Sequence, residues 1–363
     1  MITKVDSSSY LVFSIGKVKK INILLLGGNI MFRLKKRNWA YIIFGLTITL
    51  YLLTPGLAEA AERKGWPKRV TIGSGPLQGV LYAIAASWST MLNKELNINS
   101  SVESTGGTVP NVKLMNAGNL ELAMLTTGIA QQGWSGEGYA EGKKHTNIRL
   151  IIPWGMSPLK YWTMRKSGVM RVEDIEGKRL NMGRPGSTVD VFMRDLFKIT
   201  GLKPSQLVNV DHGQANQMLQ DGLLDVASAM GPRHPGITSI TTELGSKILV
   251  FGIGKGDWAK KMLEKYPYFV PMTVAGNTYK GTPEPIETIG ELNWFAAGAQ
   301  MPEDFVYEVV KLTYEKKKDL MASNVIFEDM NASEAKNALI PLHPGAIRYY
   351  KEMGIQIPSP AMP

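Results

Sequence analysis

The stretch VESTGGTVPN, at residues 102–111, decides the fold that the sequence predicts. Its first residue, Val102, ends a run that we interpret as a short strand, and a turn of Ser, Thr and Gly follows. After this turn, apolar Val109, Val112 and Met115 recur at helical spacing, which predicts a helix. The first N–H groups of a helix have no partner within the helix, and the helix dipole is positive at that end. A strand, a glycine turn and a helix N-terminus therefore predict a place where an anion binds.

Two further segments repeat this arrangement. GSGPLQG at 73–79 precedes a predicted helix at 80–94, and GRPGST at 183–188 precedes a predicted helix at 189–200. A predicted strand comes before each of these turns. A single Gly-Ser turn is more often a plain connector than a ligand contact. Three such turns in one chain indicate one small anionic ligand held between several helix N-termini.

The candidate ligand-binding residues lie in these turns and in the turn after a predicted strand at 121–125. They are Ser74, Gly75, Gln78, Ser104, Thr105, Gly106, Gly107, Asn111, Thr126, Thr127, Arg184, Gly186, Ser187 and Thr188. Glycines would let the backbone approach a ligand closely, and hydroxyls would add donors. Arg184 could pair with a carboxylate through two parallel hydrogen bonds. Turn formation or helix capping explains each of these residues as well, and Trp154 could either form a wall of the cleft or pack at a hinge.

Predicted strands and helices alternate along the chain, which is the pattern of an α/β fold with parallel strands. An apolar strand at 149–154 is separated from a second predicted strand at 161–165 by a hinge, where the chain would enter a second lobe. A second crossing is predicted near 271–274. The expected lobes are residues 61–154 plus 272–363 for lobe 1, and residues 155–271 for lobe 2.

The N-terminal region reads as a secretory signal. A basic segment, RLKKR at 33–37, precedes an apolar run at 39–53 and an Ala-Glu-Ala cleavage site, so residues 31–60 are predicted to be a signal peptide. The apolar run is short for a membrane span, although an uncleaved membrane anchor is the alternative. Residues 1–30 lie upstream of this signal, and we interpret them as a non-native extension ahead of a true start at Met31.

Composition excludes several classes of function. The chain has no cysteine, and none of its four histidines lies at a zinc-ligand spacing from another, so we expect no metal site and no cofactor. The net charge of +10 is concentrated in residues 1–60, and acids and bases are interspersed after them. This distribution is typical of a solvated surface, so no nucleic-acid partner is expected. His343 precedes a Pro-Gly pair at a predicted helix start, where a structural role is favoured over a catalytic one.

The chain after the signal peptide resembles the TAXI group of solute receptors for TRAP transporters. The matching motifs are GSG at 73–75, the turn at 103–107 with Asn111, ELA at 121–123, IEGKR at 175–179, GRPGS at 183–187, DG at 221–222 with DVA at 225–227, and PLHPGAIRYY at 341–350. The resemblance implies a periplasmic binding protein fold of two lobes joined by two chain crossings. It also implies a receptor that is not an enzyme, is monomeric, and delivers a small carboxylate such as glutamate or 2-oxoglutarate to TRAP permease subunits.

The chain departs from the family pattern at two of the candidate positions. The family turn usually reads Gly-Ser-Gly-Thr, whereas this chain has Gly186, Ser187, Thr188 and Val189. Relatives often carry Gln and an acid where this chain has two threonines, at 126–127. These changes leave the identity of the carboxylate open.

Two alternatives to a transport receptor remain. A secreted hydrolase is disfavoured because the chain has no Gly-x-Ser-x-Gly elbow, no His-Glu-x-x-His zinc helix and no phosphate-binding loop ending in Gly-Lys. A periplasmic ligand receptor for a sensor kinase would have the same binding fold as a transport receptor. The sequence does not distinguish between these two partners.

Overall fold

The computed structural model describes residues 10–11, 23–26, 29–31, 65–77 and 79–362. The chain forms two compact units, Met1–Lys64 and Gly65–Pro363. In the first unit, the short strands β1 (Tyr10–Leu11), β2 (Ile23–Leu26) and β3 (Asn29–Met31) form an antiparallel sheet. Apart from Met31, the predicted signal peptide lies outside the described residues, and so does most of the predicted extension at 1–30. Within the described part of the chain, no helix has the length and apolar character needed to cross a membrane.

The second unit is built on ten hydrogen-bonded strands. They are β4 (Arg69–Gly73), β5 (Asn99–Glu103), β6 (Leu122–Thr126), β7 (Ile148–Met164), β8 (Arg179–Asn181), β9 (Gln206–Val208), β10 (Val226–Met230), β11 (Ile248–Phe251), β12 (Val270–Val274) and β13 (Ile286–Gly298). Their order is β5-β4-β6-β13-β7-β10-β8-β9, with β11 beside β7 and β12 beside β13. β4 pairs in parallel with β5 and β6, and β8 pairs in parallel with β9 and β10, which confirms the predicted α/β alternation.

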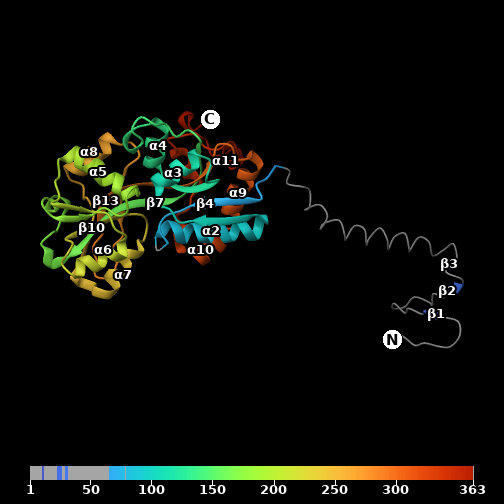
Figure 1. Ribbon diagram of the computed structural model, residues 1–363, viewed down its shortest axis with the longest axis horizontal. Helices are drawn as coiled ribbons and strands as arrows, with labels where there is room; N and C mark the ends of the chain where they lie inside the picture. Colours follow the sequence, from blue (N-terminus) through green and yellow to red (C-terminus); the bar gives the residue numbers. More distant parts are fainter. Residues whose placement is uncertain (1–9, 12–22, 27–28, 32–64, 78, 363) are drawn as a thin grey trace. The chain divides into compact units, whose positions relative to one another are not determined.

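Helices cover both faces of these strands. The α-helices are α2 (Val80–Leu96), α3 (Thr108–Asn116), α4 (Thr127–Ser135), α5 (Thr188–Thr200), α6 (His212–Gln220), α7 (Pro235–Leu244), α8 (Asp257–Lys265), α9 (Glu303–Glu315), α10 (Lys317–Ser323) and α11 (Pro344–Glu352). The 3-10 helices are η3 (Gly138–Ala140), η4 (Arg165–Ser167), η5 (Val172–Ile175), η6 (Gly245–Lys247), η7 (Val325–Asp329), η8 (Ala332–Asn337) and η9 (Ser359–Ala361). Figure 1 shows two groups of helices, one around β4 and one around β10. We call the elements packed on β4, β5 and β6 the first lobe, and those packed on β8, β9, β10 and β11 the second lobe.

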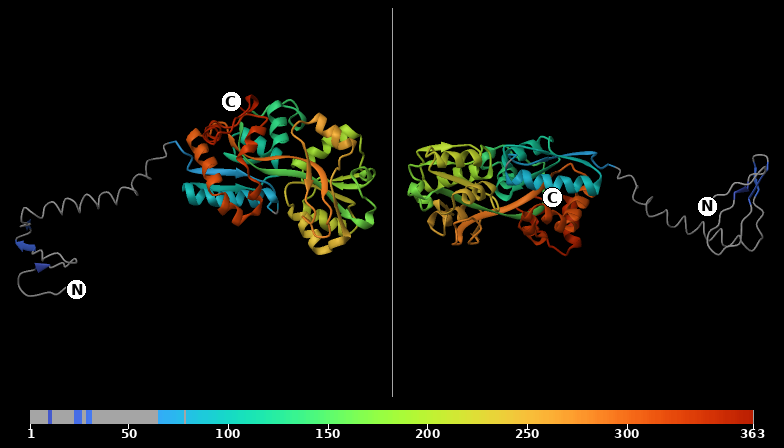
Figure 2. Two further views of the ribbon diagram at one scale, coloured as in Figure 1. Left: turned by 180° about the vertical axis from the view of Figure 1, so that it is seen from behind. Right: turned by 90° about the horizontal axis from the view of Figure 1, so that it is seen from below.

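Two long strands connect the lobes. The first part of β7, up to Pro158, pairs with β13, and its last part, from Leu159, pairs with β10 and β11. The first residues of β13 pair with β12, and its last residues pair with β6. Figure 2 shows β13, in orange, running from the second lobe into the first. The chain therefore crosses between two lobes twice, which confirms the predicted α/β fold of two lobes joined by two chain crossings.

The predicted break at the first crossing is wrong. The segments expected as two strands, at 149–154 and 161–165, are parts of the single strand β7. Ser157 and Pro158 pair with Glu291 and Gly290 of β13, and this pairing keeps the intervening backbone extended. Glycine and proline in this segment indicated a turn, but pairing with a distant strand determined its conformation.

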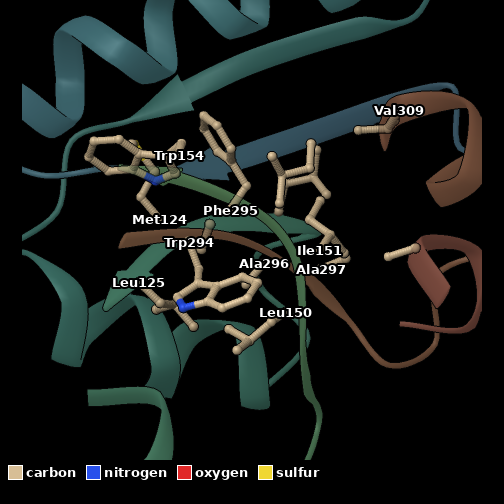
Figure 3. Packing of buried hydrophobic residues seen from close by; sticks show 14 of the residues in the cluster. Met124, Leu125, Leu150, Ile151, Trp154, Trp294, Phe295, Ala296, Ala297 and Val309 are labelled. Carbon is tan, nitrogen blue, oxygen red and sulfur yellow. The ribbon is translucent and has the colours of Figure 1, made fainter. Parts of the chain in front are cut away.

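Each lobe has its own hydrophobic core. In the first lobe, Trp88 of α2 stacks on Phe295 of β13 with ring centroids 4.1 Å apart, and Trp154 packs nearby. Figure 3 shows part of this core, with Trp154 beside Met124 and Phe295. The second lobe has one cluster on each face of its sheet.

His343 has the structural role that the sequence indicated. Its ring caps α11, since Nδ1 accepts the N–H of Gly345 at 3.2 Å. The other ring nitrogen lies 3.0 Å from the carbonyl oxygen of Met301. Burial lowers the pKa of His343 to about 4, so the ring is neutral at physiological pH.

Candidate functional site

A pocket of about 590 Å³ lies between the two lobes. Helix N-termini from both lobes and side chains of β7 and β13 line it. The helix N-termini belong to α2 and α3 of the first lobe and to α5, α6 and α7 of the second. This volume is in the range of pockets that hold small organic ligands.

Several backbone donors at these helix N-termini have no acceptor within the described part of the chain. These donors are first-turn N–H groups of residues that line the pocket, and they form no hydrogen bond with any other described residue. They belong to Val80, Leu81, Thr108, Thr188, Val189, His212 and Gly213. The first N–H groups of a helix have no acceptor within it, and the dipoles of these helices place positive partial charge at their N-termini. These N-termini therefore contribute positive partial charge to the pocket from the backbone.

The turns of the two lobes touch beside this pocket. The hydroxyls of Thr108 and Thr188 are 3.0 Å apart, and the N–H of Val109 donates to the carbonyl oxygen of Gly186 at 3.1 Å. Gly107 has φ +127°, and a Cβ placed on it would lie 3.2 Å from the Cα of Ser187. A side chain at position 107 would therefore separate the two turns. These contacts join the lobes as in a closed form of a two-lobed protein.

The candidate residues divide between the pocket wall and the structure behind it. Those that line the pocket are Ser104, Gly106, Gly107, Thr126, Arg184, Ser187 and Thr188. Those that lie outside its lining are Ser74, Gly75, Thr105, Asn111, Thr127 and Gly186. Gln78 falls outside the described residues.

Thr105 and Asn111 stabilise the turn at residues 103–107. The Thr105 hydroxyl lies 2.9 Å from the carbonyl oxygen of Ser74 and 2.7 Å from Oδ1 of Asn111, and it accepts the N–H of Gly107 at 3.1 Å. The Asn111 amide donates to the carbonyl oxygens of Ser74 and Met124 at 2.8 and 2.9 Å. These side chains hold three neighbouring segments of the first lobe together.

Thr127 and Ser187 also have structural partners. The Thr127 hydroxyl accepts from Nε1 of Trp294 at 2.9 Å and lies 3.1 Å from the carbonyl oxygen of Leu292. Ser187 caps α5, because its hydroxyl accepts the N–H of Asp190 at 3.4 Å. Ser187 nevertheless lines the pocket as well.

The charged side chains of the pocket wall form one pair. Arg184 lies 3.6 Å from Asp211, and both side chains are partly exposed. Asp211 also caps α6 by accepting the N–H of Gln214 at 3.0 Å. Asp211 therefore partly neutralises the charge of the Arg184 guanidinium.

Two histidines of the second lobe face each other at the pocket. The rings of His212 and His234 are in edge-to-face contact, with centroids 4.3 Å apart. Nε2 of His212 lies 3.3 Å from the carbonyl oxygen of Ser228, and Nδ1 of His234 accepts the N–H of Gly236 at 3.2 Å. Burial lowers the pKa of His212 to about 4 and that of His234 well below its usual value, so both rings are neutral at physiological pH.

The two crossing strands supply the polar groups at the base of the pocket. They are Trp154 and Ser157 of β7 and Asn293 of β13. The Asn293 amide donates to the carbonyl oxygen of Gly155 at 3.0 Å. Trp154 is 1% exposed, and its Nε1 donor has no acceptor among the described residues. A buried donor without an acceptor is costly unless a ligand or a water accepts from it.

Sequence reasoning named Trp154 of β7 as a possible wall of the cleft, but it missed the pocket residues of α6 and α7 and the residues Ser157 and Asn293 of the crossing strands. The start of α7 carried one usable signal, because Pro235 follows the end of a predicted strand and Pro is favoured at the first position of a helix. Ser157 and Asn293 carried no local signal, since pairing between β7 and β13 places them together. No cluster of three or more acidic or histidine side chains that could hold a metal ion occurs among the described residues.

A family model described as the NMT1-like family matches residues 72–354. The chain belongs to the NMT1-like family. The matched segment of this NMT1-like protein includes every α-helix that begins at the pocket and both crossing strands.

Solved structures with low similarity to the NMT1-like chain include three ligand-binding proteins. An ancestral arginine-binding protein bound to glutamine is 13% identical, with TM-score 0.43, over 72% of this chain and 97% of its own. The GluR0 ligand-binding core from Nostoc punctiforme, in complex with L-glutamate, is 12% identical, with TM-score 0.45, over 71% and 97%. A substrate-binding protein of an ABC uptake transporter from Streptococcus pneumoniae, with bound histidine, is 13% identical, with TM-score 0.45, over 69% and 88%. At this level of similarity, their ligands carry no information about the ligand of the NMT1-like chain.

Proposed function

We propose that this protein is a periplasmic receptor that captures a small carboxylate and delivers it to a TRAP transporter. The observation that carries the proposal is the convergence of five helix N-termini on one pocket between two lobes. A carboxylate in this pocket would accept hydrogen bonds from backbone N–H groups that have no acceptor among the described residues. Backbone donors cost less to desolvate than a bare charge pair, so they suit a site that must also release its ligand.

The proposed activity is binding without chemistry. Nucleophilic catalysis needs a hydroxyl or another nucleophile hydrogen-bonded to a base. Among the described pocket residues, no serine or threonine hydroxyl is hydrogen-bonded to His212 or His234. This arrangement argues against the alternative of a secreted hydrolase.

Closure of the two lobes on the ligand is the second part of the proposed mechanism. A ligand shifts an equilibrium between open and closed forms only if it binds the closed form more tightly. Donors from α2 and α3 lie in the first lobe, and donors from α5 and α6 lie in the second. A ligand can therefore contact both sets only in the closed form, and this difference would drive closure.

The transporter type and the location rest on the sequence. The motifs shared with TAXI receptors support TRAP permease subunits as partners of a monomeric receptor, and the predicted signal peptide supports export to the periplasm. A sensor kinase that reads the same ligand is the alternative partner. Uptake of labelled ligand by cells with and without this gene separates the two, because a receptor that serves only a sensor leaves uptake unchanged.

A thermal-shift screen of protein purified from cells expressing the full chain tests the proposal. The screen should include glutamate, 2-oxoglutarate, C4-dicarboxylates and aromatic acids, with the corresponding primary amides as controls. A ligand at about one hundred times its Kd adds about 2.7 kcal/mol of stability, which raises the Tm by several degrees. A shift with a carboxylate but not with its amide supports the proposal. Equal shifts with amides, or shifts with cationic ligands alone, would contradict it.

A further inference from the structure

We propose that the ligand is a carboxylate that carries an apolar body and no ammonium group. This inference rests on the proposed carboxylate-binding function and narrows the class of ligand. It excludes α-amino acids such as glutamate and favours acids in which a hydrocarbon or aromatic group occupies most of the pocket.

Among the described residues that line the pocket, no carboxylate without a partner is available to pair with an ammonium group. Asp211 is the acidic side chain among the described lining residues, and it already pairs with Arg184 and caps α6. Glu291 lies near the pocket on β13 but does not line it, and its carboxylate accepts the N–H of Gly128 at 2.5 Å. A ligand ammonium group would therefore be buried without a counter-charge, which is unfavourable.

The helix N-termini also disfavour a cation. Each of the five N-termini at the pocket places positive partial charge toward the ligand. This charge attracts a carboxylate and repels an ammonium group a few ångströms away. In an α-amino acid the ammonium and carboxylate groups are both attached to the α-carbon. Repulsion of the ammonium group would therefore offset much of the binding free energy that the carboxylate contributes.

An apolar surface faces the remaining volume. It is formed by Leu77, Val80, Leu81, Val189, Met230 and Trp154. Leu77 is 67% exposed, which is unusual for a large apolar side chain at the mouth of a pocket. A hydrocarbon group of the ligand would cover these side chains, and burial of apolar surface on both partners favours binding.

The buried indole of Trp154 points to a second feature of the ligand. Its Nε1 donor has no acceptor among the described residues, and the residue lines the pocket. An oxygen of the ligand within reach of this donor would satisfy it. A carboxylate, carbonyl or hydroxyl oxygen can accept this hydrogen bond, whereas an ammonium group cannot.

Isothermal titration calorimetry with matched acids tests the proposal on the purified full-length protein. The pairs are phenylpyruvate with phenylalanine, 4-methyl-2-oxopentanoate with leucine, and 2-oxoglutarate with glutamate. Each pair shares a carbon skeleton and differs in an oxo group against an ammonium group. We expect the 2-oxo acid to bind at least tenfold more tightly in each pair, and the two acids with apolar bodies to bind more tightly than 2-oxoglutarate.

The outcomes separate this inference from the proposed function. Equal or tighter binding of the amino acids, or a preference for 2-oxoglutarate over the apolar acids, overturns the inference while supporting a carboxylate receptor. Binding of none of the six acids, or binding of amides as tightly as acids, counts against the proposed function and the inference with it.

The variant Trp154→Phe tests the role of the indole donor. It removes the N–H and keeps an aromatic ring, so the best-binding acid should bind about tenfold more weakly. Trp88→Phe is the matched control, because its Nε1 donates to Thr313 at 2.9 Å and Trp88 does not line the pocket. Unchanged affinity in a folded Trp154→Phe protein overturns this assignment. If that variant fails to fold, the ligand pairs still decide the proposal, since they need no variant.

Discussion

At the scale of single residues, Glu291 shows how burial near the pocket changes an acid. It is 2% exposed on β13, and its carboxylate accepts the N–H of Gly128 from α4. Burial raises its pKa from 4.5 to about 7, although the Gly128 N–H and the Thr126 hydroxyl both favour the charged form. The Thr126 hydroxyl interacts with this carboxyl group without forming a hydrogen bond of good geometry. The folded protein therefore keeps a proton on Glu291 at pH values where the unfolded chain has lost it.

This shift predicts how stability depends on pH. Between about pH 4.5 and about pH 7 the folded state binds more protons than the unfolded state, so the free energy of unfolding should fall as pH rises through this window. The loss from this group is about 3 kcal/mol at most. Glu291→Gln keeps an acceptor for Gly128 and removes the titration. It should therefore be more stable than the unaltered protein above about pH 7 and close to it near pH 4.5, as measured by urea denaturation.

Glu121→Gln is the matched control for this prediction. The Glu121 carboxylate also accepts a strand N–H, that of Thr71 at 2.7 Å. Because Glu291 is intact in this variant, the fall in stability across the same pH window should remain. The raised pKa of Glu291 would be refuted if the difference in free energy of unfolding between Glu291→Gln and the parent were the same at about pH 4.5 and at about pH 7.

At the scale of elements, the turn between β5 and α3 depends on side chains behind the pocket. Thr105 connects this turn to β4 through Ser74 and to α3 through Asn111. The turn presents Ser104, Gly106 and Gly107 to the pocket. The Thr105 hydroxyl therefore both stabilises the turn and holds it in position at the pocket.

Thr105→Val tests this link, since it keeps the shape of the side chain and removes the hydroxyl. The change leaves Asn111 Oδ1 and the Gly107 N–H without this partner, so the free energy of unfolding should fall by about 1–3 kcal/mol. Thr90→Val is the control, because the exposed Thr90 hydroxyl on α2 has the carbonyl oxygen of Ala86 as its one hydrogen-bond partner within the described residues, at 2.9 Å. This control should change stability by less than about 0.5 kcal/mol. Equal effects in both variants, measured by denaturation, would show that Thr105 does not brace the turn.

At the scale of the whole molecule, contacts between the lobes hold the closed form. Gln132 of α4 donates to the Asp195 carboxylate of α5 at 3.0 Å and to the Tyr268 hydroxyl at 2.9 Å. These bonds lie at a second interface between the lobes, which is separate from the contact between the turns at Thr108 and Thr188. Both interfaces exist only when the lobes are close together.

Gln132→Ala should shift the protein toward the open form. The apparent affinity for ligand falls in proportion to the fraction of closed, binding-competent protein, so we expect a loss of about three- to tenfold without any change in the pocket itself. Small-angle X-ray scattering of the ligand-free protein should show a larger radius of gyration than in the parent. Gln131→Ala is the control, because Gln131 has no hydrogen bond to the second lobe among the described residues. Unchanged scattering and affinity in Gln132→Ala would show that this interface does not control closure.

Much of the fold followed from local patterns in the sequence. The alternation of apolar strands and amphipathic helices predicted the α/β class, and the glycine turns marked the starts of α2, α3 and α5. These features depend on residues a few positions apart, and hydrophobic periodicity and turn chemistry report such local preferences directly. The TAXI-like motifs predicted two lobes and two crossings, and the pairing of β7 and β13 agrees with this.

The candidate site was less accessible to local reasoning. A hydroxyl next to a glycine turn has the same sequence pattern whether it faces the pocket, as Ser104 does, or bonds to neighbouring backbone, as Thr105 does. The direction of each side chain depends on segments that lie far away in the sequence. The assignment of ligand contacts among the candidate residues therefore stays a prediction until a ligand is bound.

The sequence by itself determined the class of fold and the positions of three helix N-termini that face the pocket. Only the tertiary structure decided that the N-termini of α6 and α7 join them, that Trp154 and Asn293 lie at the base of the same pocket, and that Arg184 pairs with Asp211. The physical reason is that local propensities act over a few residues, whereas a pocket forms where segments from both lobes meet through pairing of β7 with β13 and contact between the turns. Packing of distant segments, not the chemistry of any one segment, determines which groups a ligand can reach.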